Sequence, residues 1–243
     1  MSRFAGKRYW LVGATEGLGL ALAQALRAEG ADLVVSARDK VRLSVVCAEL
    51  GAMPVGMDIA DAESVAEAAK AVGDVDGLVL LAAVYWPMAA ADMDTAKLAA
   101  MCDVNLTGTA RVLGAVLPNM VARGSGHVVL TGSLAGYRGL PGAVGYAASK
   151  AGVMVLAESL YVDLRGSGVR VQLANPGFIA TRLTAQNGFA MPFLMTPDVA
   201  AGHMLRLMRS DRFKSSFPAP FSWLFRFGQG LPDWLWYRLF PRG

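Results

Sequence analysis

The sequence is poor in the side chains that hold metal ions and form disulfides. Its 243 residues include only two cysteines and two histidines. Cys47 and Cys102 lie far apart and form no Cys-x-x-Cys motif, so we expect neither a disulfide framework nor a zinc site. With His127 and His203 as the only histidines, a His-based metal centre or a Ser-His-Asp triad has little to be built from. We therefore expect no metal, and unpaired cysteines favour a reducing compartment, the cytoplasm.

Charged residues and long apolar runs are also scarce. Only 17% of the residues are charged and 54% are hydrophobic, which argues against disorder. No uninterrupted apolar run reaches about 18 residues, so we predict no transmembrane helix, and the short basic start predicts no signal peptide. Residues 1–202 hold 16 Lys and Arg against 17 Asp and Glu, whereas residues 203–243 hold 7 against 2. Because the excess positive charge is confined to the tail, we expect no nucleic-acid partner.

Short apolar runs alternate along the chain with Ala- and Leu-rich segments of helical spacing. The apolar runs are almost uninterrupted, which is typical of parallel strands buried on both faces. The alternation predicts an α/β protein with a doubly wound parallel sheet, in a single domain over residues 1–212. Residues 213–243 form an aromatic-rich C-terminal extension. The strands are predicted over residues 8–13, 32–37, 77–83, 126–132 and 169–176, and helices over stretches such as 18–30 and 147–168.

Three glycines directly follow the first predicted strand, in the stretch 13-GATEGLG-19. Glycine lets the backbone approach a ligand closely, and a helix N-terminus offers free N–H groups to a pyrophosphate. The spacing is GxxxGxG rather than the GxGxxG of the usual dinucleotide fingerprint, and an ordinary tight turn would also account for it. Its position between a strand and a helix favours a dinucleotide-binding loop.

An arginine directly follows the second predicted strand, in the stretch 34-VVSARD-39. In a dinucleotide-binding fold this strand end lies near the adenosine ribose, where an acidic residue would hold the 2′-hydroxyl of NAD. Arg38 would instead suit the 2′-phosphate of NADP, although it could also be a plain surface arginine. Glu16, in the glycine loop, could face the same phosphate and oppose it. On balance these charges favour NADP(H) over NAD(H) as the cofactor.

Tyr146 and Lys150 lie four residues apart in the stretch 145-GYAASKAG-152. On a helix this step places both side chains on one face. An ammonium group beside a phenol favours the phenolate and lowers the phenol pKa, and a poised tyrosine can act as a general acid or base. Taken alone, the pair could equally be a surface aromatic beside a solvated lysine.

Together and in this order, these motifs resemble the short-chain dehydrogenase/reductase family over residues 7 to about 200. The resemblance implies a Rossmann fold and hydride transfer between NADP(H) and a carbonyl/alcohol pair, with Asn105, Ser133, Tyr146 and Lys150 as the catalytic residues. In that role Tyr146 is the general acid or base, and Ser133 polarises the carbonyl. Lys150 lowers the tyrosine pKa and binds the nicotinamide ribose, and Asn105 holds a water for proton relay.

The resemblance also implies which residues contact the cofactor. Asp58 resembles the family's aspartate beside the adenine, and Thr181 the residue that holds the nicotinamide carboxamide. The full set comes from the glycine loop, the strand ends and a Pro-Gly motif: Gly13, Thr15, Glu16, Gly17, Leu18, Gly19, Arg38, Asp58, Ile59, Ala82, Ala83, Tyr146, Lys150, Pro176, Gly177, Ile179 and Thr181.

The chain departs from the family at residues 80–83, which read LLAA where NNAG is usual. Losing two amides removes hydrogen bonds that satisfy the local backbone, and Ala83 adds a methyl group where the backbone approaches the ligand. This departure leaves open an alternative function, a cofactor-binding sensor or scaffold protein with little or no turnover.

Two apolar segments follow the predicted site. The first lies where the family has its substrate lid, and it contains five apolar side chains: Phe189, Met191, Phe193, Leu194 and Met195. These side chains favour an apolar carbonyl or alcohol substrate. They could also simply pack on the fold. The second is the extension over residues 213–243. Prolines and glycines break it, so it cannot be one amphipathic helix. It interleaves aromatic residues with arginines: Trp223, Trp234, Trp236, Tyr237, Arg226, Arg238 and Arg242.

Such a segment suits packing on the fold, an oligomer partner or a membrane interface. A homo-oligomer is the family's habit, and peripheral membrane contact through the extension is the alternative.

Overall fold

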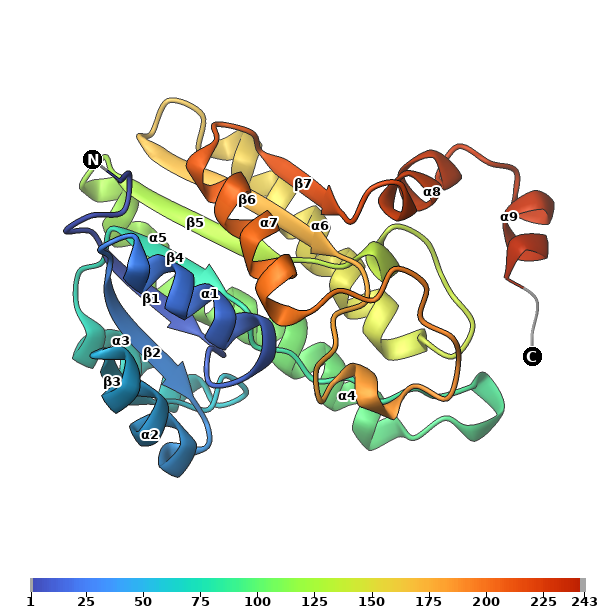
Figure 1. Ribbon diagram of the computed structural model, residues 1–243, viewed down its shortest axis with the longest axis horizontal. Helices are drawn as coiled ribbons and strands as arrows, with labels where there is room; N and C mark the ends of the chain where they lie inside the picture. The colour runs from blue at the N-terminus through green and yellow to red at the C-terminus, as the bar shows by residue number, and fades with distance from the viewer. Residues whose placement is uncertain (1, 241–243) are drawn as a thin grey trace.

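Seven strands form one parallel sheet in the part of the chain that this computed structural model describes, residues 2–240 (Figure 1). Their order in the sheet is β3-β2-β1-β4-β5-β6-β7. Because the order changes direction beside β1, the sheet has a switch point between β1 and β4. The predicted doubly wound α/β fold is confirmed. The strands are β1 (Arg8–Val12), β2 (Asp32–Ala37), β3 (Met53–Gly56), β4 (Gly77–Leu80), β5 (Gly126–Thr131), β6 (Val169–Pro176) and β7 (Lys214–Phe217).

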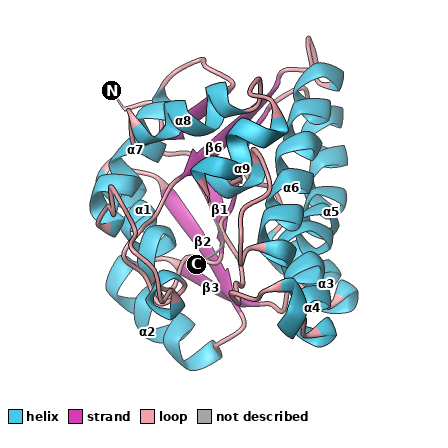
Figure 2. Cartoon of the chain, turned by 90° about the vertical axis from the view of Figure 1, so that its right-hand side faces the viewer, coloured by secondary structure: helices cyan, strands magenta, loops and turns pink. Residues whose placement is uncertain are grey.

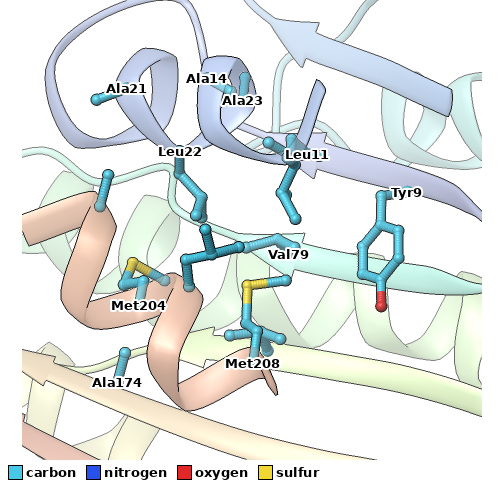
Figure 3. Close-up of a cluster of buried hydrophobic side chains, with 14 of the residues drawn as sticks. Tyr9, Leu11, Ala14, Ala21, Leu22, Ala23, Val79, Ala174, Met204 and Met208 are labelled. Atoms are coloured by element: carbon cyan, nitrogen blue, oxygen red, sulfur yellow. The ribbon is translucent and has the colours of Figure 1, made fainter. Parts of the chain in front are cut away.

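Helices cover both faces of the sheet (Figure 2). One face packs against α1 (Gly17–Ala28), α2 (Lys40–Leu50) and α7 (Pro197–Arg209). In Figure 3, Leu22 of α1 and Met204 and Met208 of α7 meet Leu11 of β1 and Val79 of β4. The other face packs against α3 (Ala62–Val72), α5 (Gly108–Ala122) and α6 (Val144–Asp163), and α4 (Thr95–Cys102) lies beside α6.

This double cover explains the uninterrupted apolar runs in the sequence. Successive strand residues point to opposite faces of a sheet. In β1, Tyr9 and Leu11 enter one core cluster while Trp10 and Val12 enter the other. Both faces must therefore be apolar, and the period-two alternation of a half-exposed strand does not appear.

The two edge strands were not predicted, because each differs from a buried run. β3 reads MPVG and has only one buried residue, and β7 reads KSSF. β7 pairs with β6 and lies within the segment 213–243 that we predicted as an extension, so only the residues after Phe217 leave the sheet. The predicted strand 77–83 ends at Leu80.

Two short helices, α8 (Phe221–Gly228) and α9 (Asp233–Leu239), follow β7 and stand beyond its carboxyl end (Figure 1). Phe225 and Trp236 bury one side of this pair against Leu134. The Arg138 guanidinium donates to the carbonyl oxygens of Gly228 and Leu231, at 2.7 and 2.8 Å, and pairs with Asp233. The extension thus packs on the fold in part. Arg242 lies outside the described residues, and no described helix is long and apolar enough to span a bilayer.

A polar network is buried at the amino ends of β5 and β6. Gln172 Nε2 faces main-chain carbonyls such as Leu207 O at 2.9 Å, so its Oε1 accepts from His127 Nε2, also at 2.9 Å. His127 Nδ1 then accepts from the Tyr9 hydroxyl, at 2.8 Å, and from Arg170, at 3.0 Å. Burial first, and the charge of Arg170 second, lower the pKa of His127 to about 3. The fold therefore holds His127 neutral.

We predict that His127 makes the protein acid-sensitive. Since its folded-state pKa lies below the ordinary 6.5, its contribution to stability is complete above that pH and is lost as the pH falls towards 3. Between about pH 7 and pH 4 the free energy of unfolding should fall by about 3 kcal/mol through this group. Urea unfolding at pH 7 and pH 4 measures this fall in the free energy of unfolding. In His127→Gln the fall should be smaller than in the parent protein by about 3 kcal/mol. His203→Gln, the matched control, should retain most of it; an equal drop in all three proteins would contradict the prediction.

Candidate active site

A cavity of about 390 Å³ lies at the carboxyl ends of the central strands. Gly13 after β1, Ala82 after β4 and Gly132 after β5 all line it. It therefore coincides with the switch point of the sheet, beside which ligands of open α/β proteins bind. Every residue that the sequence predicted to contact the cofactor lines this one cavity, and so does Ser133. Asn105 does not line it.

The floor of the cavity is a tight contact between the glycine loop and the end of β4. Gly13 has a φ of +88°, and a Cβ there would lie 2.5 Å from the main-chain nitrogen of Ala82. A Cβ on Gly19 would lie 2.3 Å from the carbonyl oxygen of Gly13. Glu16, at the N-cap of α1, makes no side-chain capping bond, so the first N–H groups of α1 are left for a ligand.

The LLAA turn packs as an apolar turn. Leu80 is buried in one core cluster and Leu81 packs against the other. The main-chain N–H groups of Leu81 and Ala82 both donate to the carbonyl oxygen of Val12, at 2.9 Å each. These two N–H groups are thus satisfied without side-chain amides, and Ala83 lines the cavity. The physical reason for expecting a damaged site is therefore weakened.

Ser133, Tyr146 and Lys150 meet on one wall of the cavity. Tyr146 and Lys150 lie one turn apart on α6, and Ser133, just after β5, is close enough to the Tyr146 phenol to act on its pKa. The buried Lys150 Nζ donates to the carbonyl oxygen of Thr131 at 2.9 Å and lies 5.8 Å from the centroid of the Tyr146 ring. Proton donors of three kinds therefore converge where a small molecule could enter.

The pKa of Tyr146 shifts in the direction opposite to our expectation. We expected Lys150 to lower it, but burial raises the pKa of Tyr146 to about 12, against a smaller lowering by the nearby Ser133 hydroxyl and with a further increase from Tyr85. Burial also lowers the pKa of Lys150 to about 8. At neutral pH the site therefore combines a protonated phenol with a mostly charged ammonium group, which suits proton donation.

Asn105 lies behind the cavity rather than on its wall. It occupies a π-helical turn, Asp103–Thr107, between α4 and α5. Its buried Oδ1 accepts from Val84 N at 2.8 Å, and its Nδ2 donates to Val84 O and to Ser149 Oγ, both at 3.0 Å. These bonds fasten the loop after β4 to α6. Asn105 is thus placed as a positioning residue for the helix that carries Tyr146 and Lys150.

Two arginines of the cavity were not predicted. Glu16 accepts from Arg42 Nη1 and from Arg182 Nη2, each at 2.7 Å, and all three residues line the cavity. Arg42 lies in the first turn of α2, four residues after Arg38, and this closeness in sequence could have indicated it. Nothing in the sequence indicates that Arg182 reaches Glu16, because that contact depends on how the lid folds.

A tyrosine beside Tyr146 was also missed. The ring centroids of Tyr85 and Tyr146 are 4.9 Å apart, in an edge-to-face arrangement. The carbonyl oxygen of Tyr85 accepts from Gln186 Nε2 at 3.1 Å, which joins the loop after β4 to the lid. Of the five apolar lid residues, only Met195 belongs to the core; Met191 is half-buried, and Phe189, Phe193 and Leu194 are exposed.

Comparison with known proteins agrees with this arrangement. Residues 7–190 match the family model described as short chain dehydrogenase. The chain is 38% identical to an oxidoreductase of Myxococcus xanthus named as uncharacterized, over 92% of each protein. It is 28% identical to a ketoacyl reductase of Nostoc sp., over 86% of this chain and 78% of the relative.

A solved structure also has this fold. It is described as a short chain dehydrogenase/reductase family protein and superposes with a TM-score of 0.83 at 33% identity, over 89% of this chain and 95% of that one. The chain therefore belongs to the short-chain dehydrogenase/reductase family and is an oxidoreductase that acts on CH–OH and C=O groups.

Proposed function

We propose that this protein transfers a hydride between NADP(H) and an apolar carbonyl or alcohol, with Tyr146 as the general acid or base. One observation carries the proposal: a single cavity joins the corner of Ser133, Tyr146 and Lys150 to the glycine loop and Arg38. Hydride chemistry needs a proton donor at one end of the site and a dinucleotide cradle at the other, within one connected space.

The residues of the cavity fit a dinucleotide. The uncapped N-terminus of α1 offers N–H groups to a pyrophosphate. The Thr131 hydroxyl is buried on the cavity wall and has no hydrogen-bond partner within residues 2–240, as expected of a group that a ligand completes. By resemblance, Asp58 would hold the adenine, Lys150 the ribose and Thr181 the carboxamide. When bound, NADPH would supply the hydride.

In reduction, Tyr146 donates its proton to the substrate oxygen as negative charge develops there. Its raised pKa keeps the phenol protonated at neutral pH, so the donor is ready before the substrate enters. Ser133 holds the same oxygen by a hydrogen bond and polarises the carbonyl. In oxidation Tyr146 takes the alcohol proton instead. Lys150 contributes a positive charge to this wall, and Asn105 fixes the position of α6.

Preference for NADP(H) follows from the charges at the end of β2. Arg38 is exposed on the cavity and makes no salt bridge within residues 2–240. Arg42 adds a second guanidinium group. The nearby carboxylates are engaged: Asp39 caps α2 by accepting from Arg42 N at 3.0 Å, and Glu16 pairs with Arg42 and Arg182. A 2′-phosphate would find cations there, whereas Asp39 and Glu16 already have arginine partners.

An apolar substrate is supported by the lid. Phe189, Phe193 and Leu194 expose their side chains, and Tyr85 places a ring beside Tyr146. The related protein of Nostoc sp. is named for ketoacyl substrates, which supports a carbonyl carried on an acyl chain.

We also propose a homo-oligomer. Val155 and Val162 are exposed along α6, where a second copy could cover them. Cytoplasmic location stays a prediction from the cysteine content; Cys47 and Cys102 are both free.

Replacing Tyr146 with Phe should remove activity and keep cofactor binding. The change deletes the proton donor but retains the ring, so reduction of apolar aldehydes and ketones with NADPH should fall by about 100-fold or more. NADPH fluorescence should still report binding. Tyr161→Phe is the control, because Tyr161 lies on the same helix but stacks on Phe213, away from the cavity. Undiminished turnover in Tyr146→Phe would exclude the proposed donor, and absence of turnover in the parent protein would favour a sensor or scaffold.

The pH dependence should fall on the oxidation direction. With the pKa of Tyr146 at about 12, the ionised fraction rises about tenfold per pH unit below that value. The kcat/KM for alcohol oxidation should therefore rise steeply between about pH 6 and 8, while that for reduction stays flat. Above about pH 8, loss of the Lys150 charge should bend both profiles. Initial rates with one carbonyl/alcohol pair provide the measurement. A reduction rate that already falls tenfold per unit at neutral pH would mean that Lys150, and not burial, controls the tyrosine.

Replacing Arg38 with Ala should weaken NADPH binding selectively. Loss of a charge-assisted contact to the 2′-phosphate should raise the Kd for NADPH by about tenfold or more. The Kd for NADH should barely change. Lys40→Ala is the matched control, since Lys40 is a neighbouring exposed cation that does not line the cavity. Fluorescence titration with both cofactors gives the result, and an equal loss for NADH would refute the role of Arg38 in selectivity.

A further inference from the structure

The pair α8 and α9 exposes four aromatic side chains, which we call the C-terminal aromatic face: Trp223, Phe227, Trp234 and Tyr237. Each is more than half exposed, from 51% for Tyr237 to 74% for Phe227. The spacing of four residues in α8 and three in α9 puts each pair on one side of its helix. The opposite sides are buried through Phe225 and Trp236. The exposed rings are therefore held in place and do not serve the core of the chain.

The charge around this face is of one sign. Residues 213–243 contain four basic residues and a single acidic one, Asp233. Arg138 pairs with Asp233 and neutralises it. Arg226 and Arg238 are exposed on the two helices and make no salt bridge among the described residues. A partner of this face would therefore meet aromatic rings and uncompensated positive charge.

The C-terminal aromatic face is continuous with the substrate lid. Phe221, the first residue of α8, stacks on Phe193 of the lid with ring centroids 5.5 Å apart, and on Phe178 at 5.9 Å. Phe178 follows Gly177, which lines the cavity. In Figure 2, which views the molecule from the right-hand side of Figure 1, α8 and α9 lie in front of the sheet. Stacked rings thus link the residue after Gly177 to the first residue of α8, where the helix pair begins.

Two occupants fit exposed aromatics, a second copy of the chain or a membrane surface. A two-fold dimer would bring the same patch against itself, so Arg226 and Arg238 would face their own copies at close range. An anionic surface would instead attract both. Tryptophan and tyrosine rings favour the headgroup depth of a bilayer, where one edge is wet and the rest apolar. Short helices that each have one buried side could lie in that plane without spanning it.

We propose that the C-terminal aromatic face docks this protein on a bilayer that contains anionic phospholipid. The rings enter the headgroup region, and Arg226 and Arg238 pair with lipid phosphates. Docking would hold the lid against the membrane. An apolar carbonyl could then pass from the bilayer to the cavity, and only this passage of substrate rests on the proposed function.

Flotation of the full chain with vesicles tests the proposal. Binding should be at least about tenfold stronger to vesicles of phosphatidylcholine mixed with phosphatidylglycerol than to phosphatidylcholine alone. The double variant Arg226→Glu/Arg238→Glu should lose at least about tenfold in binding to the mixed vesicles, and Trp223→Ser/Phe227→Ser should lose a similar amount. All these side chains are exposed, so circular dichroism should show unchanged folding.

A charge-matched variant is the control. Lys70→Glu/Arg212→Glu reverses two exposed cations outside α8 and α9 that make no salt bridge among the described residues. It should bind the mixed vesicles as the parent does. An equal loss of vesicle binding in this control would mean that net charge alone causes the effect, and it would overturn the proposal. Failure of the parent protein to float with the mixed vesicles would also overturn it. A dimer that light scattering shows to dissociate in Trp223→Ser/Phe227→Ser, without vesicle binding, would identify a second copy as the occupant. None of these readouts needs turnover, so they stand or fall separately from the proposed activity.

Discussion

Two main-chain N–H groups, those of Leu81 and Ala82, share the carbonyl oxygen of Val12, and this junction holds the carboxyl ends of β1 and β4 together. The glycine loop then runs so close to Ala82 that Gly13 leaves no space for a Cβ. The cavity lies directly above this contact. Its floor is therefore main chain rather than side chain, which brings the N-terminus of α1 within reach of a phosphate and makes the site depend on the spacing of two strands.

Burial sets the protonation states on the cavity wall that carries Tyr146 and Lys150. Tyr146 and Lys150 both lose hydration on entering it, and loss of hydration favours the neutral form of each. A lysine near a phenol would by itself favour the phenolate, but at 5.8 Å from the ring its attraction does not outweigh the desolvation. The balance suits reduction, because the proton to be donated is already on the oxygen. Asn105 contributes from behind, by holding α6 to the loop after β4.

The sequence predicted those parts of the fold and site that are local in the chain. β1, β2, β4, β5 and β6 are buried on both faces, so their apolar runs are unbroken; the edge strands β3 and β7 lack that signal. The cavity residues were found because the motifs carrying them are short and contiguous. The ion pair between Glu16 and Arg182, the approach of Tyr85 to Tyr146, and the direction of the tyrosine pKa shift depend on tertiary contacts that no local pattern encodes.

Arg138 explains how a chain can present aromatic rings to solvent without losing order. Its guanidinium binds the main chain at both Gly228 and Leu231, pairs with Asp233, and lies 5.3 Å from the ring of Trp236. The turn between α8 and α9 is thus fixed from the body of the protein, and Gly228 has no Cβ because Trp236 occupies that space. Of the outward rings, Tyr237 also contacts this anchor, since the Arg138 guanidinium lies 5.6 Å from its ring centroid. The anchor otherwise uses main-chain carbonyls, Asp233 and the buried tryptophan. The aromatic character of Trp223, Phe227 and Trp234 therefore has to be explained by what the surface meets.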